Sequence, residues 1–145
     1  MKFFLIYFFS LFLSGFSYAA DPLNGTKWKA IDGRTNQPTA IIQFHEDKDG
    51  NLKATIKKIL VPDEVDKCKS CKGKYHNKSL VGLIIIKNLR KGKNNSYEGA
   101  ELLDPETGSF YRFNAKLIDN GTKLVGRGYI GLSFIGRTET WYLVD

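Results

Sequence analysis

Two cysteines, Cys68 and Cys71, are the residues of this chain whose type and spacing most directly suggest chemistry. A Cys-x-x-Cys pair can carry out thiol–disulfide exchange, contribute to a zinc site, or form a structural disulfide. A catalytic redox pair would begin a helix after a strand, whereas this pair lies in a polar, lysine-rich segment. Zinc needs three or four ligands, and only His76 lies nearby in the sequence. We expect a structural disulfide that closes a small loop, with thiol–disulfide exchange and zinc binding as alternatives.

The rest of the sequence carries no enzyme motif. Gly131-Leu132-Ser133-Phe134 lacks the closing glycine of a nucleophile elbow, and the glycine patterns that bind phosphates or dinucleotides do not occur. Paired carboxylates, Glu98 with Glu101 and Asp104 with Glu106, fit turns and solvent-facing strand positions. We therefore assign no catalytic residue, no metal and no cofactor, and an enzymatic function has no support in the sequence.

Charge is distributed unevenly along the chain. There are 22 Lys and Arg residues against 15 Asp and Glu residues, which gives a net charge of +7 at pH 7. Residues 53–93 alone carry +9, and a lysine cluster within them defines a candidate basic face: Lys67, Lys69, Lys72, Lys74 and Lys78. Such a face could attract an anionic envelope surface or an acidic protein, or serve only solubility. The lysines are not interleaved with aromatic residues, so we expect no nucleic-acid partner.

The first 19 residues predict a cleaved secretory leader. Lys2 supplies a positive start, an apolar run extends over residues 3–16, and Ser17-Tyr18-Ala19 has the small-x-small pattern of a cleavage site. The apolar run is too short for a good transmembrane helix, and no later segment is apolar enough to cross a bilayer. We therefore expect one exported domain at residues 20–145, periplasmic or secreted, with no transmembrane segment.

Short β-prone segments separated by turn residues fill the mature chain. Residues 80–89 fit either a buried strand or a short helix, and only residues 61–79 form a long connection. About eight consecutive strands favour an all-β fold, an eight-stranded up-and-down antiparallel barrel, because closure removes exposed strand edges. The expected strands are 26–31, 39–46, 51–60, 80–89, 97–103, 110–118, 123–131 and 135–144.

Several motifs of this chain resemble those of a known family. The motifs are Cys68-x-x-Cys71 with Val81-Gly82-Leu83, then Tyr97-Glu98-Gly99-Ala100, residues 104–108, Tyr111, residues 127–131 and residues 136–141. The family consists of small exported bacterial proteins catalogued as a domain of unknown function. The resemblance implies a lipocalin-like (calycin) barrel whose one long loop carries the Cys-x-x-Cys pair, and it implies no assigned reaction.

A lipocalin-like fold implies a structural role for Trp28 and Arg137. In lipocalins a Gly-x-Trp near the N-terminus closes the barrel floor, and an arginine of the last strand stacks over the indole. Here Gly25-Thr26-Lys27-Trp28 is one residue longer than that spacing, and Arg137 lies near the start of the expected last strand. An arginine over a tryptophan contributes about 0.5–2 kcal/mol. We therefore interpret Trp28 and Arg137 as barrel closure.

Alternation in the last two strands indicates candidate ligand contacts. Arg127 and Tyr129 share one face, as do Arg137, Glu139 and Trp141. Aromatic and charged side chains on an interior wall suit a small apolar or amphipathic ligand, although eight strands leave little room beyond side chains. The residues expected to line or close the cavity are Trp28, Tyr97, Tyr111, Arg127, Tyr129, Glu139 and Trp141.

Three functional hypotheses follow from these patterns. The first is an exported, non-enzymatic, lipocalin-like protein that binds a small apolar or amphipathic ligand in the barrel. The second is an envelope or host-directed interaction protein with a filled barrel, which uses the basic face in residues 53–93. The third is a thiol–disulfide protein that uses Cys68 and Cys71.

Overall fold

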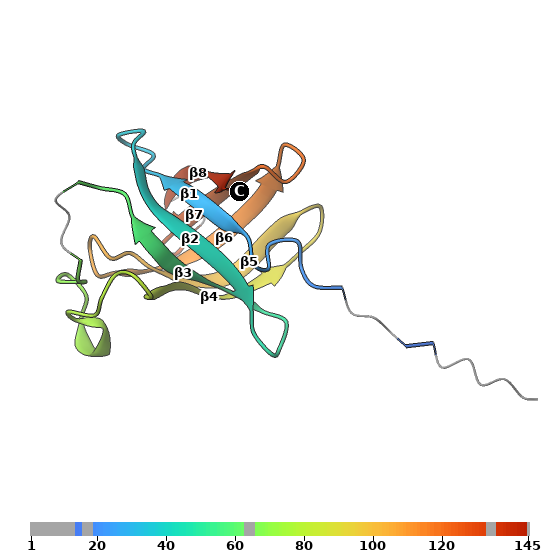
Figure 1. The fold of residues 1–145 in the computed structure, drawn as a ribbon, viewed down its shortest axis with the longest axis horizontal. Coiled ribbons are helices and arrows are strands. Elements are labelled where there is room, and N and C mark those ends of the chain that lie inside the picture. The colour runs from blue at the N-terminus through green and yellow to red at the C-terminus, as the bar shows by residue number, and fades with distance from the viewer. Residues whose placement is uncertain (1–13, 16–18, 63–65, 133–135, 145) are drawn as a thin grey trace, which may run out of the picture.

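The computed structural model describes residues 14–15, 19–62, 66–132 and 136–144. The expected leader, residues 1–19, therefore lies almost entirely outside the described residues. Eight strands make up the described fold (Figure 1): β1 (Lys27–Ile31), β2 (Pro38–Glu46), β3 (Leu52–Ile59), β4 (Ile84–Lys91), β5 (Ser96–Leu103), β6 (Phe110–Ile118), β7 (Lys123–Tyr129) and β8 (Gly136–Val144).

The strands form a closed barrel in which each strand pairs with its neighbours in the sequence and β8 pairs back with β1. Every pairing is antiparallel. The predicted eight-stranded up-and-down barrel is thus confirmed. Residues 80–89 are a strand only from Ile84 onward, and residues 80–83 belong to the long connection after β3.

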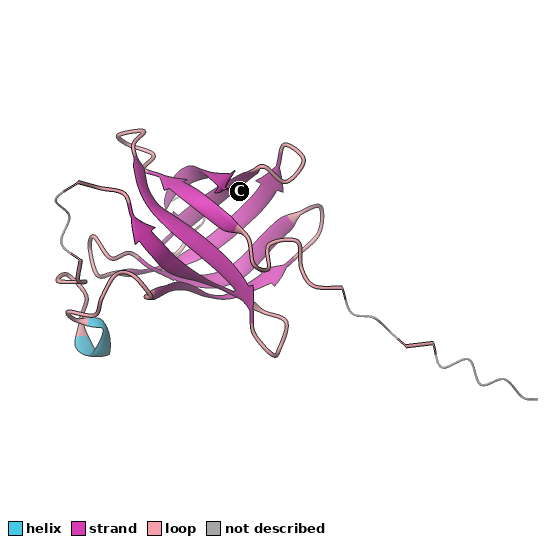
Figure 2. Cartoon of the chain, in the orientation of Figure 1, coloured by secondary structure: helices cyan, strands magenta, loops and turns pink. Residues whose placement is uncertain are grey.

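The described chain contains one short 3-10 turn, Gly73–Tyr75, within the connection between β3 and β4 (Figure 2). No helix among the described residues is long and apolar enough to cross a membrane. Because Gly73–Tyr75 is the one helical element of the described chain, any functional site among these residues is built from strands and from the loops that join them.

Period-two alternation decides which side chains enter the barrel interior. In β2, Ala40, Ile42 and Phe44 are buried, while the residues between them remain partly exposed. The first half of β3 repeats the pattern. No charged side chain is among the fully buried residues that the structure describes. The fully buried part of the described interior is thus apolar.

One end of the barrel is closed by residues 21–26, which precede β1. Leu23 is fully buried, and the chain then turns at Gly25, whose φ of +79° favours glycine. The backbone N–H of Gly25 donates to the carbonyl of Phe44 at 2.8 Å, and the N–H of Phe44 donates to the carbonyl of Thr26 at 3.0 Å. These reciprocal bonds attach the segment to β2.

Tyr97 of β5 completes this closed end. Its side chain is almost fully buried, and its hydroxyl donates to Oδ1 of Asp21 at 2.9 Å. The same Asp21 oxygen accepts the backbone N–H of Leu23 at 2.8 Å, and the backbone N–H of Asp21 donates to Glu46 at 2.7 Å. Burial, followed by the bond to Asp21, raises the pKa of Tyr97. Tyr97 therefore stays protonated and ties the segment before β1 to β5.

Replacing Tyr97 with phenylalanine keeps the ring and removes the hydroxyl. We expect the Tyr97→Phe variant to lose about 1–3 kcal/mol of unfolding free energy at neutral pH, because Asp21 loses a hydrogen-bond donor in a partly buried site. Urea denaturation followed by circular dichroism measures the difference.

The pH dependence of the difference in unfolding free energy between wild type and Tyr97→Phe tests whether the Tyr97 hydroxyl is its cause. Tyrosine in an unfolded chain ionises near pH 10, about its ordinary pKa, whereas the raised native pKa keeps Tyr97 protonated. The stabilisation by Tyr97 is therefore complete below about pH 10 and declines as the pH rises above it. The gap between wild type and Tyr97→Phe should narrow above about pH 10. A gap that stays constant there would show that the hydroxyl is not held as described.

Candidate functional site

The opposite end of the barrel is open. In an up-and-down barrel alternate connections lie at the same end, and here the connections after β1, β3 and β5 meet opposite the closed end (Figure 1). A cavity of about 900 Å³ opens between them. Its inner wall carries apolar side chains from five strands: Ala30, Ala40, Ile42, Ile56, Ile85 and Trp141.

A second, smaller cavity of about 360 Å³ lies beside the first. Its wall includes the aromatic side chains of Tyr111, Phe113 and Trp141 together with Gly126 and Gly128. The rings of Phe113 and Trp141 stack with centroids 6.0 Å apart. The two cavities share a wall made of six residues: Leu102, Asp104, Glu106, Arg137, Glu139 and Trp141.

This common wall carries a charged pair. Glu139 lies two residues before Trp141 on β8, so both side chains face inward, and its side chain is only 23% exposed. One carboxylate oxygen lies 3.4 Å from Nη2 of Arg137, and the other accepts a hydrogen bond of 3.3 Å from Nε1 of Trp141. Both oxygens are thus bound, as a half-buried carboxylate requires. The pair fixes the Trp141 indole at the back of the mouth.

The rim of the open end is joined by a second ion-pair cluster. Arg34, after β1, lies 3.5 Å from Asp32 and 3.2 Å from Glu106, which belongs to the turn between β5 and β6. The backbone N–H of Arg34 holds the pKa of Asp32 below its ordinary value. The arginine and Glu106 are exposed, so each pair contributes little stability. Their effect is to hold two rim loops beside each other.

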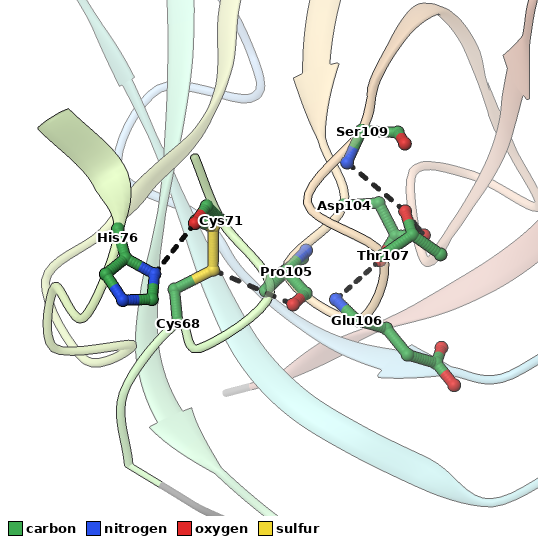
Figure 3. Close-up of a disulfide and its surroundings, with 8 residues drawn as sticks. All are labelled: Cys68, Cys71, His76, Asp104, Pro105, Glu106, Thr107 and Ser109. Atoms are coloured by element: carbon green, nitrogen blue, oxygen red, sulfur yellow. Dashed lines mark hydrogen bonds between the residues drawn. A yellow bond between two sulfur atoms is a disulfide. The ribbon is translucent and has the colours of Figure 1, made fainter. Parts of the chain in front are cut away.

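The predicted Cys68–Cys71 disulfide is confirmed. Both cysteines are buried, and Sγ of Cys68 lies 3.7 Å from the carbonyl oxygen of Pro105 (Figure 3). Nδ1 of His76 donates to the carbonyl of Cys71 at 3.0 Å. Among the described residues, no three or more His, Cys, Asp or Glu side chains are grouped so that they could hold a metal ion. Because both cysteines are buried and Cys68 lies against Pro105, the disulfide anchors the long loop.

The anchor rests on the turn between β5 and β6. At Gly108 a Cβ atom would overlap the carbonyl of Ser70, and its φ of +74° also favours glycine. A side chain at this position would push the disulfide loop off the turn. The Cys-x-x-Cys loop and residues 104–108, which are far apart in the sequence, therefore form one rim structure.

The structure separates the predicted ligand contacts into three groups: residues that line the cavities, residues of the closed end, and two residues on the outer face of β7. Tyr111, Glu139 and Trp141 line the cavities. Neither cavity is lined by Trp28 or Tyr97, which are buried toward the closed end. Nε1 of Trp28 donates to the hydroxyl of Thr26 at 2.8 Å, within the closing segment. These two residues thus complete the floor behind the cavity.

The prediction that Arg127 lines the cavity is wrong. Gly126 and Gly128 occupy the inward positions of β7, so Arg127 lies on the outer face, where it donates to the hydroxyl of Thr138 at 2.8 Å. Tyr129 shares this outer face. Its hydroxyl accepts a hydrogen bond from Asn114 at 3.4 Å, although its atoms also border the smaller cavity.

The expected closure by Arg137 on Trp28 is also wrong. Trp28 pairs with Leu143 across β1 and β8, whereas Arg137 lies six positions earlier on β8. At about 3.3 Å per residue the two are roughly 20 Å apart along the strand. First and last strands are instead joined by backbone pairing of Lys27, Trp28 and Lys29.

The five lysines of the predicted basic face also fall into two groups. Lys67 and Lys69 line the larger cavity, while Lys72, Lys74 and Lys78 are exposed on the outer part of the loop. Nζ of Lys74 lies 5.2 Å from the ring centroid of Tyr75. Sequence reasoning missed the cavity role of the first two lysines and the aliphatic wall formed by β2 and β3. The alternation of Ala40 and Ile42 in β2 was a usable signal for that wall.

The two inward glycines of β7 provide a matched test of the smaller cavity. A Cβ at Gly126 would lie 2.7 Å from the ring of Phe113, whereas a Cβ at Gly128 meets Leu102 only at 3.4 Å. We expect Gly126→Ala to lower the unfolding free energy by about 1–3 kcal/mol, because the ring must move, and to change the near-UV circular dichroism. Gly128→Ala, the control, should stay close to wild type. Equal effects of the two substitutions would contradict this packing.

Comparisons with known proteins identify a matching family and a similar solved structure. A model of the family described as uncharacterized proteins conserved in bacteria (DUF2147) matches residues 26–142. Among solved structures, the chain is similar to protein HP1028 from the human pathogen Helicobacter pylori, described as belonging to the lipocalin family, with a TM-score of 0.73 and 21% identity. The match covers 85% of this chain and 83% of that one. No curated protein matches the sequence.

The family match includes residues of all eight strands, and the structural likeness agrees with the observed lipocalin-like topology. This chain belongs to the DUF2147 family of bacterial proteins and has a lipocalin-like barrel.

Proposed function

We propose that this protein is an exported, non-enzymatic, lipocalin-like binding protein that takes up a small apolar or amphipathic molecule at the open end of its barrel. The proposal rests on the larger cavity. Its volume of about 900 Å³ matches the range of about 300–1,000 Å³ for small-molecule sites. Its lining combines aliphatic side chains and Trp141 with polar and charged side chains, so an apolar or amphipathic molecule would find both kinds of contact.

The floor behind the cavity supports a binding role. Trp28, Phe44 and Leu124 are almost fully buried between the cavity and the closing segment. A rigid floor of this kind keeps the wall residues in place whether or not the cavity is occupied. We assign ligand contact to Tyr111, Glu139 and Trp141, together with the aliphatic wall from β2 and β3.

Export to the periplasm or beyond is the second part of the proposal. The leader features of residues 1–19 and the Cys68–Cys71 disulfide both suit an oxidising compartment. Asp21, immediately after the expected mature start, is bonded to Glu46 and Tyr97. Cleavage before Ala20 would therefore leave the closing segment intact.

Export is tested by expressing the full chain in a bacterial host and sequencing the N-terminus of the soluble product. We expect a mature chain that begins at Ala20. Changing Ala19 to a bulky residue should block processing, because signal cleavage requires a small residue there. An N-terminus that retains residues 1–19 in the wild-type product would refute the leader.

Ligand binding is tested by filling the cavity. Ala40 faces the larger cavity, and its neighbour Ile41 faces outward on the same strand. We expect Ala40→Phe to weaken binding of the apolar fluorescent probe N-phenyl-1-naphthylamine at least tenfold, because the ring occupies the space of the probe. The matched variant Ile41→Phe should bind as wild type does. Native mass spectrometry of protein purified from its own host then identifies a co-purifying ligand.

A further inference from the structure

We infer that the ligand of this cavity is an anionic amphiphile, whose carboxylate or phosphate head is bound by Lys67 and Lys69 and whose apolar chain enters the larger cavity. This inference rests on the proposed binding function and adds the chemical class of the ligand. It depends on the charges at the mouth, on how the two lysines are held, and on the apolar depth behind them.

The acidic side chains at the mouth are already bound to partners. Asp32 and Glu106 pair with Arg34, and Glu139 pairs with Arg137 and Trp141. Asp104 accepts hydrogen bonds from the backbone N–H of Glu106 at 2.9 Å and from the hydroxyl of Thr107 at 3.2 Å. A cationic ligand head would therefore have to compete with the arginines or with these hydrogen bonds for the carboxylate oxygens. These four carboxylates are the acidic residues that line the two cavities.

The lysines differ from these acids. Lys67 and Lys69 line the larger cavity, and within the described part of the chain neither ammonium group has an ion pair or side-chain hydrogen bond. The two ammonium groups thus have no direct carboxylate partner among the described residues. A single anionic head placed between them would interact with both, and beside a low-dielectric apolar wall this attraction is stronger than in bulk water.

The backbone that carries the two lysines is fixed. Lys67 forms a β-bridge with Ser79, and the N–H of Cys68 donates to the carbonyl of Lys78 at 2.8 Å. Between the lysines, Cys68 is buried and joined to Cys71, with its sulfur against Pro105 (Figure 3). Although both side chains are exposed, their Cα positions are therefore held at the cavity edge. The disulfide gains a role in binding because it presents the two charges.

The apolar part of the ligand has space behind the lysines. Besides Lys67 and Lys69, the larger cavity is lined by the apolar side chains of Leu80, Ile85, Ile42 and Trp141. An unbranched or ring-bearing apolar chain would bury against these side chains, at about 25 cal/mol per Å² of apolar surface. An acidic head at the edge and an apolar chain inside is the arrangement of a fatty acid or an alkyl phosphate.

The test compares four probes with the same apolar chain: dodecanoic acid, dodecyl phosphate, dodecanol and dodecyltrimethylammonium. Each probe is tested for displacement of N-phenyl-1-naphthylamine from wild-type protein at low ionic strength, below its micelle concentration or, for dodecanol, below its solubility limit. We expect the two anions to bind at least tenfold more tightly than dodecanol, and the cation to bind more weakly than dodecanol. The advantage of the anions should fall as salt is added, because these lysines are solvent-accessible.

Two double variants identify the lysines responsible. In K67Q/K69Q the preference for anions over dodecanol should disappear, while the affinity for dodecanol itself stays unchanged. The control K72Q/K74Q removes the same charge from the outer part of the same loop and should keep the preference. Circular dichroism and thermal unfolding check that both variants fold, which is expected because all four side chains are exposed.

The outcomes separate this inference from the proposed function. If dodecanol or the cation binds as tightly as the anions, or K67Q/K69Q keeps the preference, the inference is refuted while the binding function stands. If wild-type protein binds neither N-phenyl-1-naphthylamine nor any dodecyl probe, the binding function fails and the inference fails with it. Preference for only one anion supports the inference and distinguishes a carboxylate head from a phosphate head.

Discussion

Backbone pairing between β1 and β8 is the constraint on which the rest of the molecule depends. Lys27, Trp28 and Lys29 pair with Val144, Leu143 and Tyr142, and this short ladder turns an eight-stranded sheet into a barrel. Without it both edge strands would expose unpaired N–H and C=O groups. Closure also gives the sheet a concave inner face, so side chains at alternate positions meet in one interior. The cavity exists because that interior is filled from one end only.

The two ends differ because the connections differ. At the closed end, residues 21–26 fold under the barrel and are bound by Phe44, Glu46 and Tyr97. At the open end the connections remain at the rim, where they are joined to one another by the Arg34 ion pairs and by the disulfide loop on the turn at residues 104–108. At this solvent-exposed rim, ion pairs and a covalent bond join the loops, while Val61, Phe110, Ile130 and Leu132 leave apolar surface exposed. The hydrophobic effect thus stabilises the floor, while polar and covalent contacts order the mouth.

Sequence patterns predicted the positions of the strands well, but they identified the inward-facing side chains correctly in some strands and wrongly in others. Period-two alternation and the turn residues placed all eight strands within a few positions, since both signals are local. In β8 the inward face was correctly assigned, because Arg137, Glu139 and Trp141 share it. In β7 the parity was reversed, because the inward residues, Gly126 and Gly128, have no side chain to reveal them. The partners of Arg137 and the cavity role of Lys67 and Lys69 depend on register and on loop docking, which no local pattern contains.

The size of the cavity shows that it is not a packing defect. At about 24 cal/mol per Å³, a sealed apolar void of 900 Å³ would cost about 20 kcal/mol, more than the whole stability of a typical domain. The interior avoids that cost because it opens to solvent, so water or a ligand fills it. Filling the space with larger residues at Ala30, Ala40 and Gly128 would bury more apolar surface. The protein is therefore less stable with small residues at these inward positions than it would be with larger apolar ones. Such a sacrifice of stability is expected where an open interior is used for binding.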